Sequence, residues 1–328
     1  MNAIRKMLIT GGAGYIGSVL TAEALRAGHH VRALDNLRFG GESLLAFRDH
    51  PRFELHISSL LDQRKLDAAV TGVDAVVHLA AIVGDPACAA DPELAKAVNG
   101  EGSLRLWRAC GRRNVERFVF ASTCSNYGRM AQDDGWVDES SPLNPVSLYA
   151  QLKVDFEREL LGDGSDAPTG TVLRFATAYG LSPRPRFDLT VNEFSRELAL
   201  GRKLDVFGEQ FWRPYCHTHD LARACLMVIE APTEIIARQA FNVGDSGENY
   251  QKKTLVGMIL DVCPEASELV SWVSNDEDPR NYRVKFDKIR DALGFQIEHT
   301  VAGGIKEIVD AVRSGLIADP LSAAYRNV

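Results

Sequence analysis

The chain has 328 residues, of which 45% are hydrophobic, and this length fits one large α/β domain or a large domain with a smaller lobe. Its 44 acidic residues outnumber its 37 Lys and Arg residues, and the net charge of −7 argues against a nucleic-acid partner, since such binders are usually basic. Six scattered cysteines without a CxxC pair indicate reduced thiols, and the lack of a signal-peptide core or a membrane-length apolar run favours a cytoplasmic protein without a membrane partner.

The first half of the chain alternates short apolar runs with amphipathic stretches. These runs predict strands at residues 7–10, 30–34, 53–57, 74–79 and 117–121. The stretches of helical periodicity predict helices at residues 15–27, 63–70, 94–110 and 148–161. Because strands that alternate with helices form βαβ units, we predict that residues 1–175 fold as an α/β domain with a Rossmann-type, doubly wound parallel sheet.

The second half changes rhythm after about residue 175. The periodicity predicts helices at residues 189–200, 220–230, 254–262 and 301–313, and a hairpin-like stretch at residues 203–211. We expect residues 176–328 to form mainly a smaller C-terminal lobe that binds a substrate. The chain is expected to return to the sheet domain over about residues 212–243.

The sequence GGAGYIG at residues 11–17 stands between the first predicted strand and the first predicted helix. Gly11 permits a tight turn, Gly14 lets the backbone approach a pyrophosphate, and Gly17 lets the helix pack closely on the strand. Asp35 ends the second predicted strand, where a carboxylate binds ribose hydroxyls and repels an extra 2′-phosphate. The pattern therefore predicts NAD, rather than NADP, as the cofactor.

Tyr149 and Lys153 are four residues apart in a predicted helix, so their side chains lie on one face. A nearby ammonium favours the phenolate, as does the positive nicotinamide ring of NAD⁺, and we expect the two to lower the pKa of Tyr149 so that the tyrosine acts as a base. Thr123 directly follows a predicted strand, at the sheet edge where α/β proteins bind ligands. Its hydroxyl is placed to bridge a substrate hydroxyl and Tyr149.

Several motifs occur together in the order and spacing of one enzyme family. They are GGAGYIG at 11–17, DNL at 35–37, HLAA at 78–81, Asn99, STCSNYG at 122–128 and Y-x-x-x-K at 149–153, followed by RPYCH at 213–217. With these motifs the chain resembles the extended short-chain dehydrogenase/reductases. Within them it is most similar to the nucleotide-sugar epimerase/dehydratase family, which includes UDP-galactose 4-epimerases and dTDP-glucose 4,6-dehydratases. The resemblance runs from residue 6 to about residue 312.

The resemblance implies a set of roles for residues of this chain. Tyr149 would be the catalytic base, Lys153 would tune it and hold the nicotinamide ribose, and Thr123 would be the accessory hydroxyl. The implied cofactor site comprises Gly11, Gly14, Tyr15, Ile16, Gly17, Asp35, Asn36, Ser59, Leu60, Leu79, Ala80, Ala81, Asn99, Ser122, Tyr149, Lys153 and Phe175. The implied substrate site comprises Val83, Thr123, Cys124, Thr177, Asn192, Val206, Phe207, Arg213 and Arg280.

The segment after Thr123 departs from the related 4,6-dehydratases, which have Asp-Glu where this chain has Cys124-Ser125. Those carboxylates supply the acid and base of water elimination, so this chain is expected to act as an NAD-dependent nucleotide-sugar 4-epimerase. Cys124 is either a small residue of the pocket wall, as in simple 4-epimerases, or a thiol that transfers a proton at C5 in a dehydratase or C5 epimerase.

Three further expectations follow from the resemblance and the composition. A nucleotide-sugar 4-oxidoreductase and a non-catalytic NAD-binding sensor remain alternatives to the epimerase. His217 and His219 form an HxH pair without further ligands at a suitable spacing, so no metal is expected. A homodimer is expected, through the helices predicted at residues 94–110 and 148–161.

Overall fold

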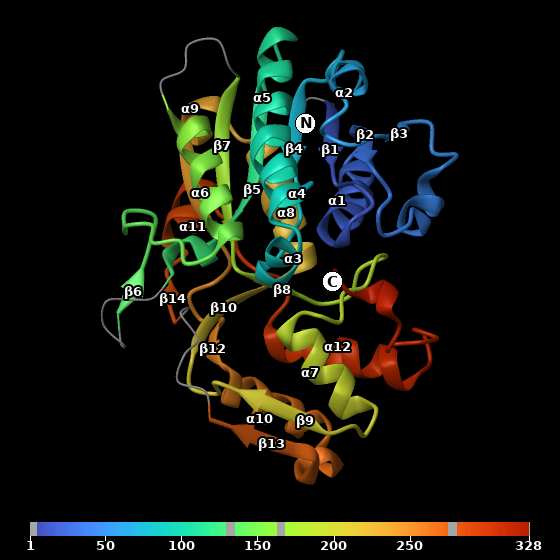
Figure 1. Ribbon diagram of the computed structural model, residues 1–328, viewed down its shortest axis with the longest axis vertical. Helices are drawn as coiled ribbons and strands as arrows, with labels where there is room; N and C mark the ends of the chain where they lie inside the picture. Colours follow the sequence, from blue (N-terminus) through green and yellow to red (C-terminus); the bar gives the residue numbers. More distant parts are fainter. Residues whose placement is uncertain (1–4, 129–134, 163–167, 275–280, 328) are drawn as a thin grey trace.

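The computed structural model describes residues 5–128, 135–162, 168–274 and 281–327. Seven parallel strands form one sheet in the order β11–β7–β5–β4–β1–β2–β3 (Figure 1). Their bounds are β1 Lys6–Thr10, β2 His30–Asp35, β3 Phe53–Ile57, β4 Ala75–His78, β5 Arg117–Thr123, β7 Thr169–Phe175 and β11 Gln239–Val243. This order and the parallel pairing confirm the predicted Rossmann-type sheet.

Helices cover both faces of the sheet. On one face, α1 (Tyr15–Arg26) and α8 (Thr218–Glu230) pack together over the sheet. On the other face lie α2 (Gln63–Val70), α5 (Ser103–Arg112) and α6 (Leu148–Leu161). Because strand side chains alternate between the faces, Met7 and Ile9 join the first core and Leu8 joins the second. This double burial explains why the strands read as continuous apolar runs.

The helix predicted at residues 94–110 is divided into three parts. A short α4 (Pro92–Ala95) leads into a π-helical segment, Lys96–Gly102, and α5 follows it. This segment packs closely against Leu60. Gly102 permits the approach, because a Cβ at this position would lie 3.0 Å from the Cβ of Leu60. The π-helical segment directs Asn99 inward, where its amide bonds to the backbone N–H and C=O of Ile82 at 2.8 and 2.9 Å. The segment therefore fixes the chain just after β4.

The C-terminal half builds a lobe with its own apolar core (Figure 1). Its strands are β8 (Thr177–Tyr179), β10 (Trp212–His217) and β12 (Asn249–Gln251) in one small sheet, and β9 (Leu204–Phe207) with β13 (Val270–Val273) in another. Its main helices are α7 (Thr190–Ala199), α10 (Lys252–Val262) and α12 (Val301–Arg313). The predicted hairpin at 203–211 is wrong, because β9 pairs in parallel with the distant β13.

Short elements connect these parts. They are α3 (Asp85–Ala90), β6 (Trp136–Val137), α9 (Thr233–Ile236), β14 (Arg283–Val284) and α11 (Asp287–Leu293), with 3-10 turns at Glu42–Phe47, Cys124–Tyr127, Pro264–Leu269 and Ala323–Tyr325. After β10 the chain returns to the large sheet through α8 and adds β11 beside β7. The described helices include none that is long and apolar enough to cross a membrane.

Candidate functional site

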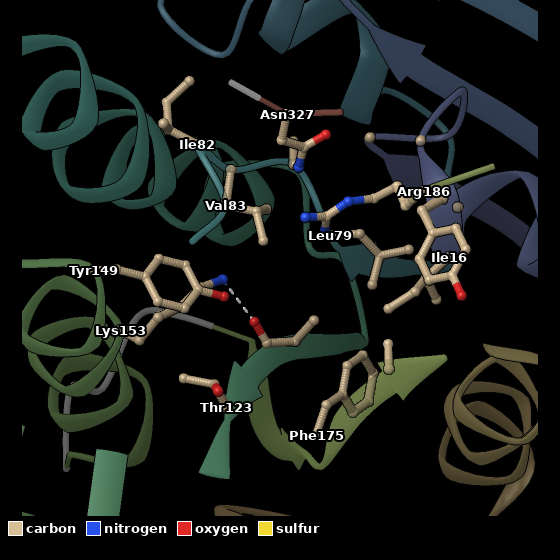
Figure 2. Close-up of a pocket in the computed structure, with 18 of the residues that line it drawn as sticks. Ile16, Leu79, Ile82, Val83, Thr123, Tyr149, Lys153, Phe175, Arg186 and Asn327 are labelled. Carbon is tan, nitrogen blue, oxygen red and sulfur yellow. Dashed lines mark hydrogen bonds between the residues drawn. The ribbon is translucent and has the colours of Figure 1, made fainter. Parts of the chain in front are cut away.

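A cavity of about 460 Å³ lies where the carboxyl ends of the large sheet face the lobe. Parallel α/β sheets bind ligands at this edge. Most residues predicted for the two sites line it, and Figure 2 shows several of them pointing into the space. The predicted residues that line the cavity are Gly11, Gly14, Tyr15, Ile16, Gly17, Asp35, Asn36, Ser59, Leu60, Leu79, Ala80, Ala81, Val83, Ser122, Thr123, Tyr149, Lys153, Phe175, Thr177 and Arg213.

The glycine-rich turn forms one wall of the cavity and has no room for side chains at Gly11 and Gly17. Gly11 has a φ of +73°, and a Cβ there would lie 2.9 Å from the backbone N of Ala80. A Cβ on Gly17 would lie 2.0 Å from the carbonyl oxygen of Gly11. The turn thus brings the N-terminus of α1 to the cavity with bare backbone, a surface that fits the diphosphate of a dinucleotide.

Asp35 lies at the end of β2 beside this turn. Its carboxylate accepts hydrogen bonds from the backbone N–H of Ala13 at 3.0 Å and of Leu37 at 2.8 Å. Burial raises the pKa of Asp35, although these backbone N–H groups oppose the shift. The fixed carboxylate at the end of β2 fits the ribose hydroxyls of an NAD molecule whose diphosphate lies at the turn.

Tyr149, Lys153 and Thr123 face the same part of the cavity (Figure 2). The Ser147 side chain caps α6 by accepting from the backbone N–H of Ala150 at 3.2 Å, and it thereby sets the first turn that carries Tyr149. Lys153 donates from Nζ to the carbonyl oxygen of Ala121 at 2.7 Å. Its Nζ lies 5.8 Å from the centre of the Tyr149 ring. The lysine is thus anchored to β5 beside the phenol.

The protein residues around Tyr149 do not by themselves lower its pKa, so the expected lowering depends on the positive nicotinamide ring. Burial is the main influence on Tyr149 and raises its pKa, with Cys88 acting in the same sense and Arg186 in the opposite one. Burial also lowers the pKa of Lys153 to about 8, which the charges of Cys88 and Glu157 oppose.

A buried charge network that the sequence analysis missed lies directly behind these residues. Glu157 is 1% exposed and accepts from Arg174 of β7, with Nη2 at 2.8 Å and Nε at 3.1 Å. Ser122 and Asn126 also donate to this carboxylate, Asn126 at 2.7 Å. The signal in the sequence is the spacing of Tyr149, Lys153 and Glu157, which places a third polar residue on one face of the helix.

The structure contradicts the catalytic role considered for Cys124. The side chain is 1% exposed and is part of the core on one face of the sheet. Its Sγ donates to the carbonyl oxygen of Arg174 at 3.2 Å, and burial raises the pKa of the thiol well above its usual range. Cys124 does not line the cavity, because the chain leaves β5 after Thr123 in the 3-10 turn Cys124–Tyr127, which places the Cys124 side chain in the core while Thr123 and Ser125 line the cavity.

The part of the cavity next to Thr123 contains polar groups from both halves of the chain. Arg213 lies 5.2 Å from the centre of the Tyr282 ring and donates to the carbonyl oxygen of Trp212 at 2.7 Å. The Tyr282 hydroxyl lies 3.3 Å from the Ser125 Oγ. Neither Ser125 nor Tyr282 was predicted, and only the position of Ser125 next to Thr123 gave a local signal. Arg280, which was predicted, lies outside the described residues.

Four other predicted residues do not line the cavity. Asn99 uses its amide to hold Ile82 after β4, as described above. Asn192 is 2% exposed, and its amide bonds to Gly180 and to the backbone of the loop before α7. The β9–β13 pairing buries Val206 in the core of the lobe and leaves the Phe207 side chain 50% exposed. Asn99, Asn192 and Val206 are thus used in packing or positioning, and the Phe207 side chain is half exposed outside the cavity.

Another unpredicted group comes from the loop before α7 and from the end of the chain. Arg184, Arg186 and Asn327 line the cavity, and Figure 2 shows Arg186 and Asn327 facing it from the side opposite Tyr149. In the sequence the loop appeared only as a cluster of proline and arginine at residues 182–187. The described residues include no cluster of His, Cys, Asp or Glu arranged to hold a metal.

Comparisons with known proteins agree with this geometry. Residues 7–244 match the family described as the NAD dependent epimerase/dehydratase family. A dTDP-glucose 4,6-dehydratase of Streptomyces niveus is 29% identical over 94% of this chain and 93% of its own length. A UDP-glucose 4-epimerase of Corynebacterium glutamicum is 28% identical, with 95% and 96% covered. The crystal structure of the dTDP-glucose 4,6-dehydratase DesIV of Streptomyces venezuelae, with NAD bound, has a TM-score of 0.82, 26% identity and coverage of 94% and 97%.

Proposed function

Because the chain belongs to the NAD-dependent epimerase/dehydratase family, we propose that it is a nucleotide-sugar 4-epimerase that oxidises C4 transiently. The observation that carries this proposal is the composition of the cavity wall. Among the described residues that line it, Asp35 is the only carboxylate, and it lies at the end of β2, beside the glycine-rich turn. The thiol at position 124 faces away from the cavity. The wall therefore offers a base for C4 but no described carboxylate pair for eliminating water.

The proposed roles follow from the positions of the side chains. Tyr149 removes the proton of the C4 hydroxyl, and Thr123 bridges that hydroxyl and the phenol. Lys153 holds the cofactor ribose and supplies a positive charge near the phenolate. Bound NAD supplies the acceptor for the C4 hydride and the donor that returns it. Inversion at C4 would require the 4-keto sugar to rotate in the cavity and present its other face before C4 is reduced again, and no cofactor would be consumed overall.

The proposed substrate is a sugar attached to a nucleoside diphosphate. Arg213 and Lys252 line the end of the cavity that also contains Thr123 and Tyr282. A guanidinium and an ammonium at this place suit the two phosphates of such a substrate. The similar proteins named above act on UDP-glucose or dTDP-glucose by their names, which supports the class without choosing the nucleotide.

The proposal includes a homodimer joined by the helical run 92–112 and by α6. These two segments contact each other within the chain, so together they offer one continuous helical surface. Sedimentation of the purified protein tests this part, and a monomer at micromolar concentration would contradict it.

The test is incubation with a panel of nucleotide sugars in D₂O, followed by NMR and mass spectrometry. A 4-epimerase gives a product of unchanged mass with C4 inverted and no deuterium on carbon. Loss of one water, or deuterium at C5, would refute the proposal in favour of a 4,6-dehydratase or a C5 epimerase. The dehydratase is the second candidate, because a 4,6-dehydratase is among the similar proteins that span nearly the whole chain.

The same experiment separates the remaining alternatives. Release of a 4-keto sugar with stoichiometric NADH would identify a 4-oxidoreductase. Binding of NAD without turnover of any nucleotide sugar would identify a non-catalytic sensor. The presence of Thr123, Tyr149 and Lys153 together on the cavity wall supports an enzyme over a sensor.

A further inference from the structure

The loop 182–188 brings the guanidinium of Arg186 over the cavity from the side of the lobe. Arg186 makes a bidentate pair with Asp188: Nε donates to Oδ1 at 3.0 Å and Nη2 donates to Oδ2 at 2.7 Å. The third guanidinium nitrogen, Nη1, makes no hydrogen bond to any of the described residues. Figure 2 shows the guanidinium reaching into the cavity between Ile16 of the glycine-rich turn and Val83. The side chain is therefore held rigidly and still has donors available.

The last described residues of the chain hold this loop in place. The backbone N–H of Phe187 donates to the carbonyl oxygen of Tyr325 at 2.8 Å. The backbone N–H of Asn327 donates to Asp188 Oδ2 at 3.1 Å, so the carboxylate that orients Arg186 is itself fixed by the end of the chain. Arg184 donates to the Asn327 side chain at 2.7 Å and stacks 4.3 Å above the Phe39 ring, which follows β2. The lobe, the chain end and the sheet domain thus meet above the cavity.

The position of Arg186 coincides with the path of a dinucleotide. A dinucleotide that places its diphosphate at the glycine-rich turn extends from Asp35, at its adenosine end, to Tyr149, at its reactive end. The positive charge of Arg186 opposes the rise that burial causes in the pKa of Tyr15, within the turn, and of Tyr149. Arg186 lines the same cavity as the turn and Tyr149, and Figure 2 shows it across the cavity from Tyr149.

We propose that Arg186 binds the diphosphate of NAD from the lobe side, opposite the backbone N–H groups of the glycine-rich turn. A guanidinium matches phosphate oxygens with paired hydrogen bonds, and the anchored geometry lowers the entropy cost of forming them. The two halves of the chain then hold the cofactor between them. Asp188 acts as the positioning residue for this contact, since it holds the Arg186 guanidinium and is itself fixed by the backbone N–H of Asn327.

The test measures binding of NAD, ADP-ribose and adenosine to the cofactor-free protein by titration calorimetry. Arg186→Met should weaken NAD and ADP-ribose binding by about 10–100-fold, as expected for loss of a charge-assisted phosphate contact. Adenosine has no phosphate, so its affinity should stay unchanged. Arg186→Lys keeps the positive charge but cannot form the bidentate contact. Its affinity for NAD and ADP-ribose should lie between those of the wild type and Arg186→Met. Arg202→Gln, at an exposed position just after the lobe helix α7, is the matched control and should bind all three ligands normally.

Three results would overturn the proposal. If Arg186→Met binds ADP-ribose with unchanged affinity, Arg186 does not contact the diphosphate. If its affinities for adenosine and ADP-ribose fall equally, the substitution has only a structural effect. Weaker binding of UDP-glucose with unchanged NAD binding would assign Arg186 to the substrate instead. If Arg186→Met does not fold, Arg186→Lys decides the matter, and ADP-ribose affinity equal to wild type in that variant would refute the contact. All readouts are binding constants, so they stand apart from the outcome of the epimerase test.

Discussion

Replacing Glu157 by Gln should destabilise the protein more than any comparable change on the same helix. The carboxylate is 1% exposed and accepts hydrogen bonds from Arg174, Ser122 and Asn126. An amide of the same size keeps the volume but removes the charge that balances Arg174, whose side chain is 6% exposed. Removing one partner of a buried ion pair usually costs about 3–5 kcal/mol, because the other charge stays buried without compensation.

The assay is urea unfolding followed by circular dichroism, with Glu159→Gln as the control. Glu159 is exposed on the same helix, and its substitution should change the free energy of unfolding by less than about 0.5 kcal/mol. The double variant Glu157→Gln with Arg174→Met should recover part of the loss, since it removes both charges. A coupling energy near zero, or a Glu157→Gln cost below about 1 kcal/mol, would refute the view that this pair is an essential buried contact.

Three further variants test other features of the site. Burial lowers the Lys153 pKa from its usual 10.5 to about 8, so the desolvation penalty is complete below pH 8 and disappears as the pH rises to 10.5. The wild type should therefore gain stability relative to Lys153→Met between pH 8 and 10.5 in urea titrations, and a loss over that range would contradict the reasoning. Gly17→Ala would place a Cβ 2.0 Å from the Gly11 carbonyl oxygen, so calorimetry should show weaker NAD binding and the thermal unfolding should show a loss of about 1–3 kcal/mol. Cys124→Ala should leave kcat nearly unchanged in the epimerase assay, since the thiol bonds to the Arg174 carbonyl, and a loss of several orders of magnitude would restore a catalytic thiol.

Local patterns were sufficient for the sheet and for the centre of the site. Apart from the exposed edge strand β3, the strands follow from apolar runs that are buried on both faces, and the turn at residues 11–17 follows from glycines at positions where no side chain fits. The spacing of Tyr149 and Lys153 gave their common face directly. These features depend on neighbours within a few residues, which the sequence displays.

The parts that were missed depend on contacts between distant segments. Glu157 meets Arg174 only when α6 packs against β7, and Asn327 reaches the cavity only through the loop 182–188. Cys124 and Thr123 are adjacent in sequence, and the turn that begins at Cys124 decides which of the two side chains faces the cavity. The pairing of β9 with β13 likewise joins two segments that are far apart in the sequence, so local patterns could not predict it. Side-chain direction and long-range pairing therefore required the structure.

The placement of β11 at the edge of the large sheet has a consequence for how the protein is made. Thr171 of β7 pairs with Gln239 of β11, so the edge of β7 stays open during synthesis until the chain beyond residue 243 has left the ribosome. An open, apolar strand edge is a template for pairing with other chains. A fragment that stops near residue 175 should consequently aggregate, although it contains the whole glycine-rich turn and the Tyr149–Lys153 pair. Cells that produce this protein would need to shield that nascent edge for the time taken to translate the first part of the lobe.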